Sequence, residues 1–354
     1  MASMTEERTV VIGGVDCHKH THHACTIDEQ GRRLADREFR ATRAGYRELL
    51  TWLRGQGTVR AVGIESTGAY GAGLTRSLCR AGVPVIEVNR PHAQLRQRRG
   101  KSDPIDAEGA ARGVLAGEAT QIPKDTTGIV ESIRLLKTAH NSAVKARSMA
   151  LCLLGELVVT APTELRESMR CSTLKGQATV CARLRPALDH LDDPTQATKL
   201  ALRSVARRIL ALNREIAEID VQLEALIRRA APRTTSLLGV GTQHAAELLT
   251  TLGQNYDRIH SEAAFAHLCA AAPVPASSGL TQRHRLSYQG NRQANRSLHM
   301  IAVVRLRYCS RTRAYAKRRR SEGLSNKEII RCLKRYIARQ LYRELRADLR
   351  ALAT

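Results

Sequence analysis

Short hydrophobic runs that end at acidic residues characterise the first third of the chain. Val10–Val15 consists of apolar residues and glycine and is followed by Asp16, and Arg60–Ile64 is followed in the same way by Glu65. Such runs predict buried strands, and leucines at helical spacing predict the helices between them. The expected order is strand, strand, strand, helix, strand, helix, strand, helix over residues 10–16, 21–28, 33–40, 46–53, 60–65, 70–81, 83–88 and 107–115.

The middle third changes to a helical period. A long helix is expected from about Thr127 to about Val159, whereas residues 170–194 are less regular and receive no role. Beyond them, apolar residues recur at alternating spacings of three and four over more than three heptads, which is typical of a coiled-coil seam. The seam residues are Leu202, Val205, Ile209, Leu212, Ile216, Ile219, Leu223 and Leu226.

This seam has two candidate partners, the helix over 127–159 or a second copy of the chain, and we expect self-association through it. The alternative is an ordinary helical hairpin within one chain. Because the pattern changes again after Pro232, we expect three parts: a domain over 1–120, a helical connector over 121–232 and a C-terminal domain over 233–354.

The C-terminal part begins with a turn that is suited to phosphate. Leu237–Ala246 has the form helix, Gly-x-Gly turn, helix, and the amides near Gly239 and Gly241 can hold a backbone phosphate without reading sequence. A helix is expected next over Ser261–Ala272, ending before Pro273.

Charge indicates the class of partner. The formal net charge of the 354 residues is +24, and 20 Lys and Arg residues against 4 Asp and Glu residues lie between Arg283 and the C-terminus. This stretch predicts basic helices over Arg305–Arg350, one of them capped by Ser325. Such an excess indicates a polyanionic partner, most often nucleic acid. Since aromatic residues make up only 3% of the chain, contact through Arg and Lys to phosphates fits better than a base-stacking platform.

Cysteine and histidine usage predicts neither disulfides nor structural zinc. The nine cysteines include no C-x-x-C pair, which favours a reduced, cytoplasmic protein, here expected to associate with the nucleoid. Cys17–His23 contains four histidines, but no second ligand cluster has matching spacing, so we interpret this tract as the turn and start of a β-hairpin. With Glu6 and Glu7 at the N-terminus and a longest apolar run, Met149–Val159, too short to span a bilayer, we expect no secretory signal and no membrane span.

Four carboxylates lie where the predicted order of elements would bring them together. Asp16 and Glu65 end two strands, and Asp103 and Asp106 lie three residues apart at the start of the last helix, on one face. This order of elements, with acids at these places, matches the RNase H-like arrangement. In such sites two Mg²⁺ ions about 3.5–4 Å apart clamp the attacking and leaving oxygens of a phosphodiester, and three or four carboxylates hold them.

Each carboxylate also has a simpler interpretation. Asp16 and Glu65 can be solvated strand ends. Asp103 can cap the helix while Pro104 takes its first position and Asp106 complements the helix dipole. Capping and metal binding are compatible roles, so both stay open.

A serine on an arginine-rich loop is a candidate nucleophile. Ser278 precedes Gly279, and the arginines that follow would stabilise charge on a pentacoordinate phosphorus. The alternative is a plain Ser-Gly turn, and the neighbouring Ser277 leaves the nucleophile ambiguous by one residue. The candidates for nucleic-acid contact are Arg96, Arg98, Arg99, Lys101, Gly239, Gly241, Arg283, Arg285, Arg292, Arg296, Arg331, Lys334 and Arg335.

Several motifs occur together in an order that resembles a known family. They are Val15-Asp16, Ile64–Gly68, Glu87–Pro91, Gly100–Ala107, Gly239–Gly241 and Pro273–Gly279. In this combination the chain resembles the Piv-like DEDD transposases of bacterial insertion sequences, of the insertion sequence 110 type. It departs from that pattern at Ser102 and Pro104, where the family often has Thr and Arg, and at Tyr288-Gln289, where a Lys is often seen.

The resemblance implies a fold, a chemistry and partners. The implied fold is α/β plus α: an RNase H-like (RuvC-like) N-terminal domain, a coiled-coil connector and an all-helical C-terminal transposase domain. The implied metal tetrad is Asp16, Glu65, Asp103 and Asp106, and Ser278, directly before glycine, is the implied nucleophile that forms a phosphoserine link to DNA. The implied partners are donor and target double-stranded DNA, a structured non-coding guide RNA, and further copies of the chain in a dimer that assembles into a tetramer.

Three functions from different classes therefore compete. The first is a Mg²⁺-dependent recombinase that uses a serine. The second is a RuvC-type nuclease or junction resolvase in which water is the nucleophile. The third is a non-catalytic basic nucleic-acid-binding protein with a degenerate nuclease fold, and the complete set of four carboxylates argues against it.

Overall fold

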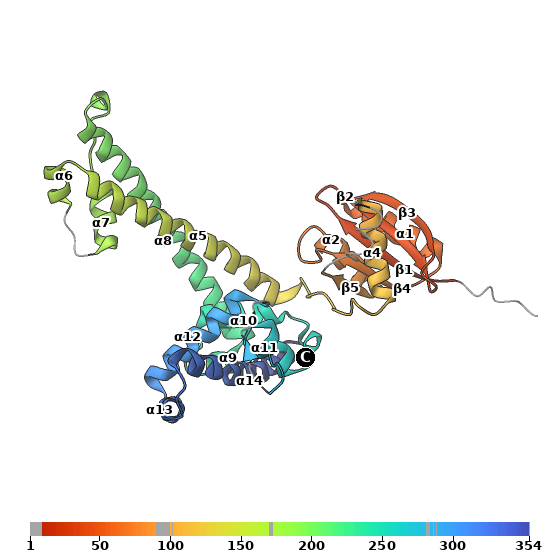
Figure 1. Ribbon diagram of the computed structural model, residues 1–354. Coiled ribbons are helices and arrows are strands. Elements are labelled where there is room, and N and C mark those ends of the chain that lie inside the picture. The colour runs from red at the N-terminus through yellow and green to blue at the C-terminus, as the bar shows by residue number, and fades with distance from the viewer. Residues whose placement is uncertain are drawn as a thin grey trace, which may run out of the picture. The chain divides into compact units, whose positions relative to one another are not determined.

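Two compact units make up the chain. The computed structural model describes residues 9–89, 100, 102–169, 173–280, 284–285, 287 and 289–353, with only the backbone at 174–175. The N-terminal unit comprises Met1–Thr126 together with Gly253–His260, and the helical unit comprises Thr127–Leu252 with Ser261–Thr354. The first is a mixed α/β unit with a central sheet, and the second is largely helical (Figure 1).

A five-stranded sheet forms the centre of the N-terminal unit, in the order β3-β2-β1-β4-β5. β2 is antiparallel to both β1 and β3, whereas β4 is parallel to β1 and to β5. The carboxyl ends of β1, β4 and β5 therefore meet at one edge of the sheet. The predicted order of strands and helices is confirmed; the elements are β1 (Val10–Cys17), β2 (Thr21–Asp28), β3 (Arg33–Arg40), α1 (Arg43–Gln56), β4 (Thr58–Glu65), α2 (Ala72–Arg80), β5 (Val85–Val88) and α4 (Asp103–Leu115).

Helices cover both faces of this sheet. Val15 and Ile64 are buried with leucines of α1 and α2, whereas Ile12 is buried with Ala107 and Ala111 of α4. Successive side chains of a strand point to opposite faces, so the even-numbered residues of β1 face α4. Asp16 is one of them, which directs its carboxylate toward the helix that begins at Asp103.

Two glycines allow α4 to lie close against the strands. A Cβ atom at Gly14 would lie 2.0 Å from the carbonyl oxygen of Ala107, and one at Gly63 would lie 2.7 Å from that of Ala110. Both distances are below any van der Waals contact, so the backbones meet only because these side chains are absent. Gly63 also fixes the face of its strand, and Glu65, two residues later, lies on the same α4 side.

A segment from far along the chain completes the N-terminal unit. Gly253–His260, which contains η2 (Tyr256–Arg258), belongs to this unit rather than to the helices that flank it. The Asn255 side chain accepts a hydrogen bond from the Asp125 amide at 3.0 Å and donates one to the Pro123 carbonyl at 2.9 Å. These two bonds join residues about 130 positions apart.

A long helical hairpin forms one part of the helical unit. Arg147 of the first helix donates to Asn213 of the second at 3.1 Å, and His140 lies 3.2 Å from Asp220. The partner number rises as the first helix is followed backwards, so the two helices are antiparallel, side by side in Figure 1. The hairpin consists of α5 (Gly128–Thr160), α6 (Thr163–Ser168), α7 (Leu174–Cys181), η1 (Leu188–His190) and α8 (Pro194–Ala230).

The heptad seam of α8 is buried against α5 within the same chain. Leu202, Val205 and Ile209 form one core with Ala150 and Leu154 of α5. The helix is longer than its seam predicts, because Asp193 caps it by accepting from the Thr195 amide at 2.8 Å and Pro194 takes the first turn. The Asp-rich turn in the otherwise unassigned region is thus the start of α8.

The C-terminal region is largely helical rather than all-helical. A short two-stranded pair, β6 and β7, interrupts it where Pro273 and Pro275 prevent a helix from continuing. A buried carboxylate fastens the last helix to the first, since Asp348 accepts from the amides of Arg233 and Thr234 at 3.0 and 2.9 Å. The elements are α9 (Pro232–Thr235), α10 (Thr242–Leu252), α11 (Glu262–Leu268), β6 (Val274–Pro275), β7 (His284–Arg285), α12 (Arg292–Tyr308), α13 (Ser310–Ser321) and α14 (Asn326–Ala353).

Two helix termini test the sequence predictions in detail. Ser325 caps α14 as predicted, in a capping box in which Glu328 accepts from the Ser325 amide at 2.9 Å. The helix expected to reach Ala272 instead ends at Leu268. Ala270 adopts a left-handed φ of 51°, and the Asn295 amide group holds its carbonyl at 2.8 Å, so a long-range side chain ends the helix.

Two further expectations concern cysteines and membranes. The eight cysteines within the described residues are all free thiols. No helix in the described part of the chain has the length and apolar character needed to cross a membrane.

Candidate active site

Two carboxylates from different elements meet at the edge of the sheet. Asp16 ends β1 and Asp103 begins α4, and an oxygen of each lies close to the same nitrogen, Nε2 of His18, at 3.2 and 3.3 Å. Asp16 is buried, at 8% exposure, while His18 and Asp103 have about half of their side chains exposed (50% and 48%). One side of the cluster is therefore open to a substrate.

His18 is a residue of this cluster that the sequence analysis placed elsewhere. It belongs to the histidine tract interpreted as a hairpin turn, and it does lie in the turn between β1 and β2. Asp16 faces α4, and His18, two residues further along, lies beside it. A histidine two residues after a strand-end aspartate was the available signal, but this spacing alone does not identify a site.

The remaining two predicted carboxylates surround the pair. Asp106, at 3% exposure, lies one turn into α4 and faces the sheet with Ala107 and Ala110. Glu65 ends β4 beside Asp16, because Val15 is paired with Ile64 in the parallel register. Ser66 follows it with a left-handed φ of 56°, which turns the chain sharply away after the acid.

Electrostatics identify these acids as one interacting group. Burial raises the pKa of Asp16; His18 lowers it, and the negative charges of Asp103 and Asp106 raise it further. Burial also raises the pKa of the Cys17 thiol to about 12, together with the charges of Asp16 and Glu65. A bound cation would offset this concentration of negative charge.

The start of α4 is not capped by Asp103. Ser102 occupies the N-cap position, its carbonyl accepts from the Asp106 amide at 3.0 Å, and Asp103 is the first helical residue. Pro104 is therefore the second helical residue and not, as had been expected, the first. The Asp103 carboxylate lies 3.3 Å from His18 Nε2, and its charge adds to the favourable interaction with the helix dipole.

The donor set fits a hard divalent cation. Asp16, His18 and Asp103 each offer one ligand atom, and these atoms lie within 4.8 Å of one another. Carboxylate oxygens are the ligands preferred by Mg²⁺ and Mn²⁺, and imidazole is tolerated better by transition metals than by Mg²⁺. The two carboxylates, with Asp106 behind them, are therefore the residues that would hold the ion.

The candidate serine lies in the other unit. Ser277 and Ser278 are both exposed, in the loop between β6 and β7. Their exposure leaves the choice between them open. The structure brings together Asp16 and Asp103, whereas Asp106 and Glu65 are not part of the cluster whose ligand atoms lie within 4.8 Å of one another. Asp106 is near enough for its charge to raise the pKa of Asp16, Glu65 lies on the neighbouring strand, and Ser278 lies in the other unit.

The predicted nucleic-acid contacts fall into three groups. Arg285, Arg331, Lys334 and Arg335 line one cavity of the helical unit. Gly239, with a left-handed φ of 87°, and Gly241 form the turn before α10, while Arg292 and Arg296 are exposed at the start of α12. Arg96, Arg98, Arg99, Lys101 and Arg283 lie outside the described residues.

Part of this basic surface is already paired. Arg335 and Arg339 of α14 both contact Glu262 of α11, at 3.2 and 2.8 Å. The sequence places this glutamate about 70 residues before the helix that it contacts, so neither spacing nor charge counts could reveal the pairing.

Comparison with known proteins assigns the family from both parts of the chain. A family model described as "Transposase" matches residues 13–160, which contain the four carboxylates. A second model, "Transposase IS116/IS110/IS902 family", matches residues 231–317, which contain the serine loop. The chain belongs to the IS110-type transposases. The transposase is thus a DNA transposase and recombinase, and its two matched segments fall one on each side of α8.

Two insertion-element proteins are similar to this transposase. The uncharacterized 42 kDa protein of insertion element IS900 from Mycobacterium paratuberculosis is 24% identical, over 95% of this chain and 96% of that protein. The uncharacterized 43.6 kDa protein of insertion element IS110 from Streptomyces coelicolor is 27% identical, over 43% of this chain and 38% of that protein.

Proposed function

We propose that this transposase cuts and rejoins DNA strands with Mg²⁺ held by Asp16, Glu65, Asp103 and Asp106 and with Ser278 as the nucleophile. The observation that carries the proposal is the meeting of Asp16 and Asp103 at 3.2 and 3.3 Å from one histidine nitrogen. Carboxylates are costly to bring together without a cation, and here a strand end and a helix start are arranged to do so.

The sheet order supports an RNase H-like assignment of the N-terminal unit. The order of elements, with acids at the ends of β1 and β4 and at the start of α4, predicted this fold from the sequence. The structure adds three antiparallel strands followed by two parallel ones, which supports the same assignment. Two Mg²⁺ ions in such a site would polarise the scissile phosphate and stabilise the leaving oxygen. Asp16 and Asp106 are buried and would fix the position of the ions, while the exposed side of Asp103 leaves room for substrate.

The serine would form a phosphoserine bond to the DNA, which keeps the phosphate activated for rejoining. Its Oγ attacks phosphorus, an Oγ–P bond forms, and the bond from phosphorus to one sugar oxygen breaks, with that oxygen taking up a proton. A hydroxyl of another strand end then attacks the phosphoserine, which releases the serine and rejoins the DNA. Arg285, on the strand that closes the same loop, would stabilise the charge on phosphorus.

A covalent trap tests the nucleophile. Full-length protein is incubated with Mg²⁺ and DNA carrying the ends of its element, then denatured, and protein-linked DNA is measured on a gel. We expect a covalent adduct with wild type, none with Ser278→Ala, and a retained adduct with Ser277→Ala. If no adduct forms although strands are cut, water is the nucleophile and the chain acts as a RuvC-type nuclease.

We further propose a structured non-coding RNA as a partner, on the basis of the basic C-terminal region. The transcript of the non-coding DNA next to the coding region is the probe, and a transcript of the same length and base composition is the control. Preferential retention of the first in a binding assay, with strand transfer lost after ribonuclease treatment, supports guidance by RNA. Strand transfer by RNA-free protein would exclude it.

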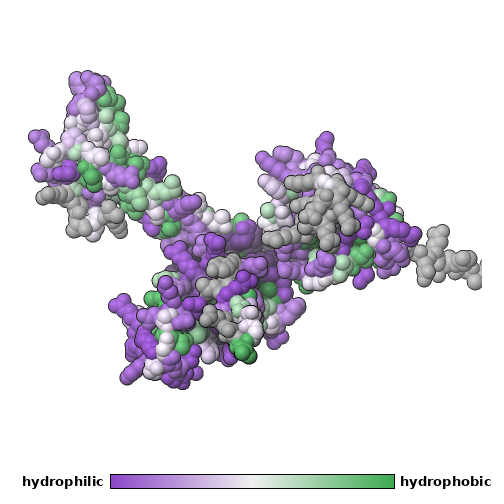
Figure 2. Space-filling model, in the orientation of Figure 1, coloured by the Kyte–Doolittle hydropathy of each residue, from purple (hydrophilic) through white to green (hydrophobic). Residues whose placement is uncertain are grey.

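Self-association is the last part of the proposal. The hairpin of α5 and α8 would act as a coiled-coil connector between a domain over 1–120 and one over 233–354, and would pair copies of the chain into a dimer and then a tetramer. Exposed apolar residues on α5 support this role, among them Leu135, Met149 and Leu153. Figure 2 shows hydrophobic residues, in green, along the surface of this hairpin.

A further inference from the structure

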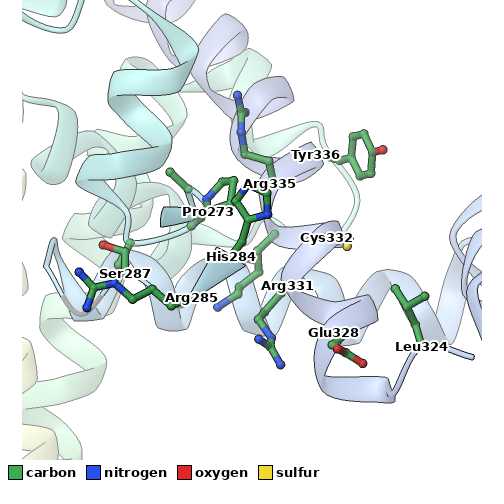
Figure 3. A pocket seen from close by; sticks show the side chains of 14 residues that line it. Pro273, His284, Arg285, Ser287, Leu324, Glu328, Arg331, Cys332, Arg335 and Tyr336 are labelled. Atoms are coloured by element: carbon green, nitrogen blue, oxygen red, sulfur yellow. The ribbon is translucent and has the colours of Figure 1, made fainter. Parts of the chain in front are cut away.

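A cavity lies at the base of the serine loop in the helical unit. Its volume is about 430 Å³, within the range of small-molecule sites. Pro273, just before β6, and the pair His284–Arg285 of β7 line it on one side, and α14 lines it on the other, as Figure 3 shows. Because β6 and β7 are the two stems of the loop that carries Ser278, the cavity and the serine share one small element.

The cavity has an apolar side and a cationic side. Ala270–Ala272, Pro273, Leu324 and Tyr336 provide the apolar surface. The cations are Arg285, Arg331, Lys334 and Arg335, and Glu328 is the acid among the lining residues. An apolar surface beside clustered cations suits a ligand that is flat and uncharged at one end and anionic at the other.

The acid does not neutralise this cationic side. One oxygen of Glu328 accepts from both the amide and the hydroxyl of Ser325, at 2.9 and 2.6 Å, and caps α14. Its single negative charge acts on Arg331 and leaves the four cations of the lining with a net positive charge. Lys334 donates to Asn295 at 3.0 Å, which occupies one of its three N–H donors. Donors for an anion therefore remain at this surface.

Arg335 contributes positive charge to the cavity rather than an accessible donor. One guanidinium nitrogen, Nη2, contacts Glu262 at 3.2 Å, whereas Nη1 is buried and has no hydrogen-bond partner among the described residues. A buried donor without an acceptor is unfavourable. Because this nitrogen has almost no accessible surface, a ligand in the cavity meets the charge of Arg335 and not this donor.

We propose that this cavity holds one unstacked nucleotide of a DNA strand, with the phosphate on the cationic side and the base against the apolar side. The inference deepens the proposed function and rests on it in one respect, since the strand concerned is the one brought to the serine loop. Phosphates of an intact duplex would need only the cations. The volume of the cavity and its apolar side are what a base outside its stack requires.

Cys332 lines the cavity and serves as a built-in reporter. Full-length protein is alkylated with N-ethylmaleimide, and the Cys332 peptide is quantified by mass spectrometry with Cys152, exposed on the hairpin, as internal control. dAMP is expected to slow alkylation of Cys332 about tenfold at ten times its dissociation constant and to leave Cys152 unchanged. Absence of protection by saturating dAMP overturns the proposal.

Two comparisons show whether the cavity binds the base as well as the phosphate, and whether it binds a single strand in preference to a duplex. Inorganic phosphate should protect Cys332 far less than dAMP, and a short single strand should protect it better than a blunt duplex of equal length. Equal protection by phosphate and dAMP would reduce the cavity to a phosphate site. Equal protection by duplex and single strand would contradict an unstacked nucleotide.

Variants of the lining residues complete the test. Arg331→Ala should weaken dAMP binding on the order of tenfold, as loss of a charge-assisted hydrogen bond predicts. Arg350→Ala, which removes the same charge from α14 outside the cavity, is the matched control and should bind normally. Ala271→Phe should block protection by filling the cavity, with an unchanged melting curve as evidence of folding, whereas unaltered dAMP binding by both cavity variants refutes the site.

The two proposals fail separately. Ser278→Ala should retain dAMP protection of Cys332, because the serine lies on the loop and not among the lining residues. If wild type forms no covalent adduct but dAMP protects Cys332, the serine nucleophile is refuted and the nucleotide site stands. If the adduct forms but dAMP gives no protection, only the nucleotide site is refuted.

Discussion

At the scale of single residues, the candidate site is a set of like charges held together by the fold. Asp16 is buried at a strand end, Asp106 is buried in a helix, and the pKa of Asp16 is raised first by burial and then by these neighbouring acids. His18 contacts both Asp16 and Asp103 and offsets part of the repulsion. The arrangement is less favourable than separated carboxylates, which is the expected property of a site prepared for a cation.

Substitution of Asp103 tests the metal site without removing atoms from the core. Asp103→Asn is isosteric and half exposed, so the fold should persist while strand transfer falls on the order of a hundredfold or more through loss of a charged ligand. DNA binding in the presence of EDTA, measured by fluorescence anisotropy, should be unchanged. Glu29→Gln, an exposed acid at the other end of the β2 strand, is the control; an equal loss of binding by Asp103→Asn would show that the residue supports the fold.

A second carboxylate predicts how stability responds to acid. Asp28 is the last residue of β2. Burial acts to raise its pKa, but hydrogen bonds from the Arg32 and Gln30 amides and the Arg32 guanidinium together lower it. A carboxyl whose folded pKa is below its unfolded value of about 3.9 stabilises the protein above that pH, and the contribution is lost as pH falls through the folded pKa. Asp28→Asn should therefore be less stable than wild type at pH 7, and the difference in urea midpoint should shrink toward pH 3. A constant difference would contradict the shift, and Glu38→Gln, exposed on β3, should show no such trend.

At the scale of elements, the position of the site depends on how closely α4 lies against β1 and β4. The absent side chains of Gly14 and Gly63 leave room for the alanines of α4, and this contact fixes the start of the helix at the strand ends. Asp103 lies one turn before Ala107, so displacement of the helix would move the carboxylate away from Asp16.

Gly14→Ala is the corresponding test. Its Cβ would meet the Ala107 carbonyl oxygen at 2.0 Å, and the clash should destabilise the N-terminal unit by about 1–3 kcal/mol and greatly reduce strand transfer. Gly55→Ala in α1, where nothing lies within 4 Å, is the matched control and should be neutral or stabilising by up to about 1 kcal/mol. Thermal melts and strand-transfer assays of both variants decide the point, and equal behaviour of the two would contradict the role of the contact.

Elements were more predictable from the sequence than contacts. The local hydrophobic pattern predicts the strands that lead to Asp16 and Glu65 and the helix that begins at Asp103, and the same holds for the other strands of the sheet. The end of α11 and the contact of Glu262 with Arg335 and Arg339 do not, because they depend on side chains far away in the sequence. His18 was missed for the same reason: its role arises from the direction in which β1 presents Asp16, which becomes evident only once α4 is placed on that face.

At the scale of the whole molecule, the hairpin of α5 and α8 has two apolar surfaces. One is the seam, which is buried inside the single chain. Ile216, for example, is only 7% exposed, so a charge there would disrupt the hairpin itself. The other is exposed and includes Leu135, Met149 and Leu153, which helical spacing places on one face of α5. Only the second surface is available to another copy of the chain.

This distinction sharpens the test of self-association. Leu153→Glu combined with Met149→Glu should convert an oligomer to a monomer in light scattering while leaving helix content by circular dichroism unchanged, since both side chains are exposed. Leu34→Glu, an exposed leucine on β3, is the control and should not change the mass. A wild-type monomer, or an unchanged mass in the double variant, would contradict pairing through this face.

The contribution of Gly253–His260 to the N-terminal unit has a consequence for how the protein is made. A ribosome releases residues 9–126 long before it adds Asn255, whose two hydrogen bonds hold Pro123 and Asp125 in place. During translation the N-terminal unit therefore lacks a piece of its own structure until more than two thirds of the chain has been synthesised. Truncated products that end before this segment would carry all four carboxylates without the contacts that complete their unit, so premature termination yields no finished N-terminal unit.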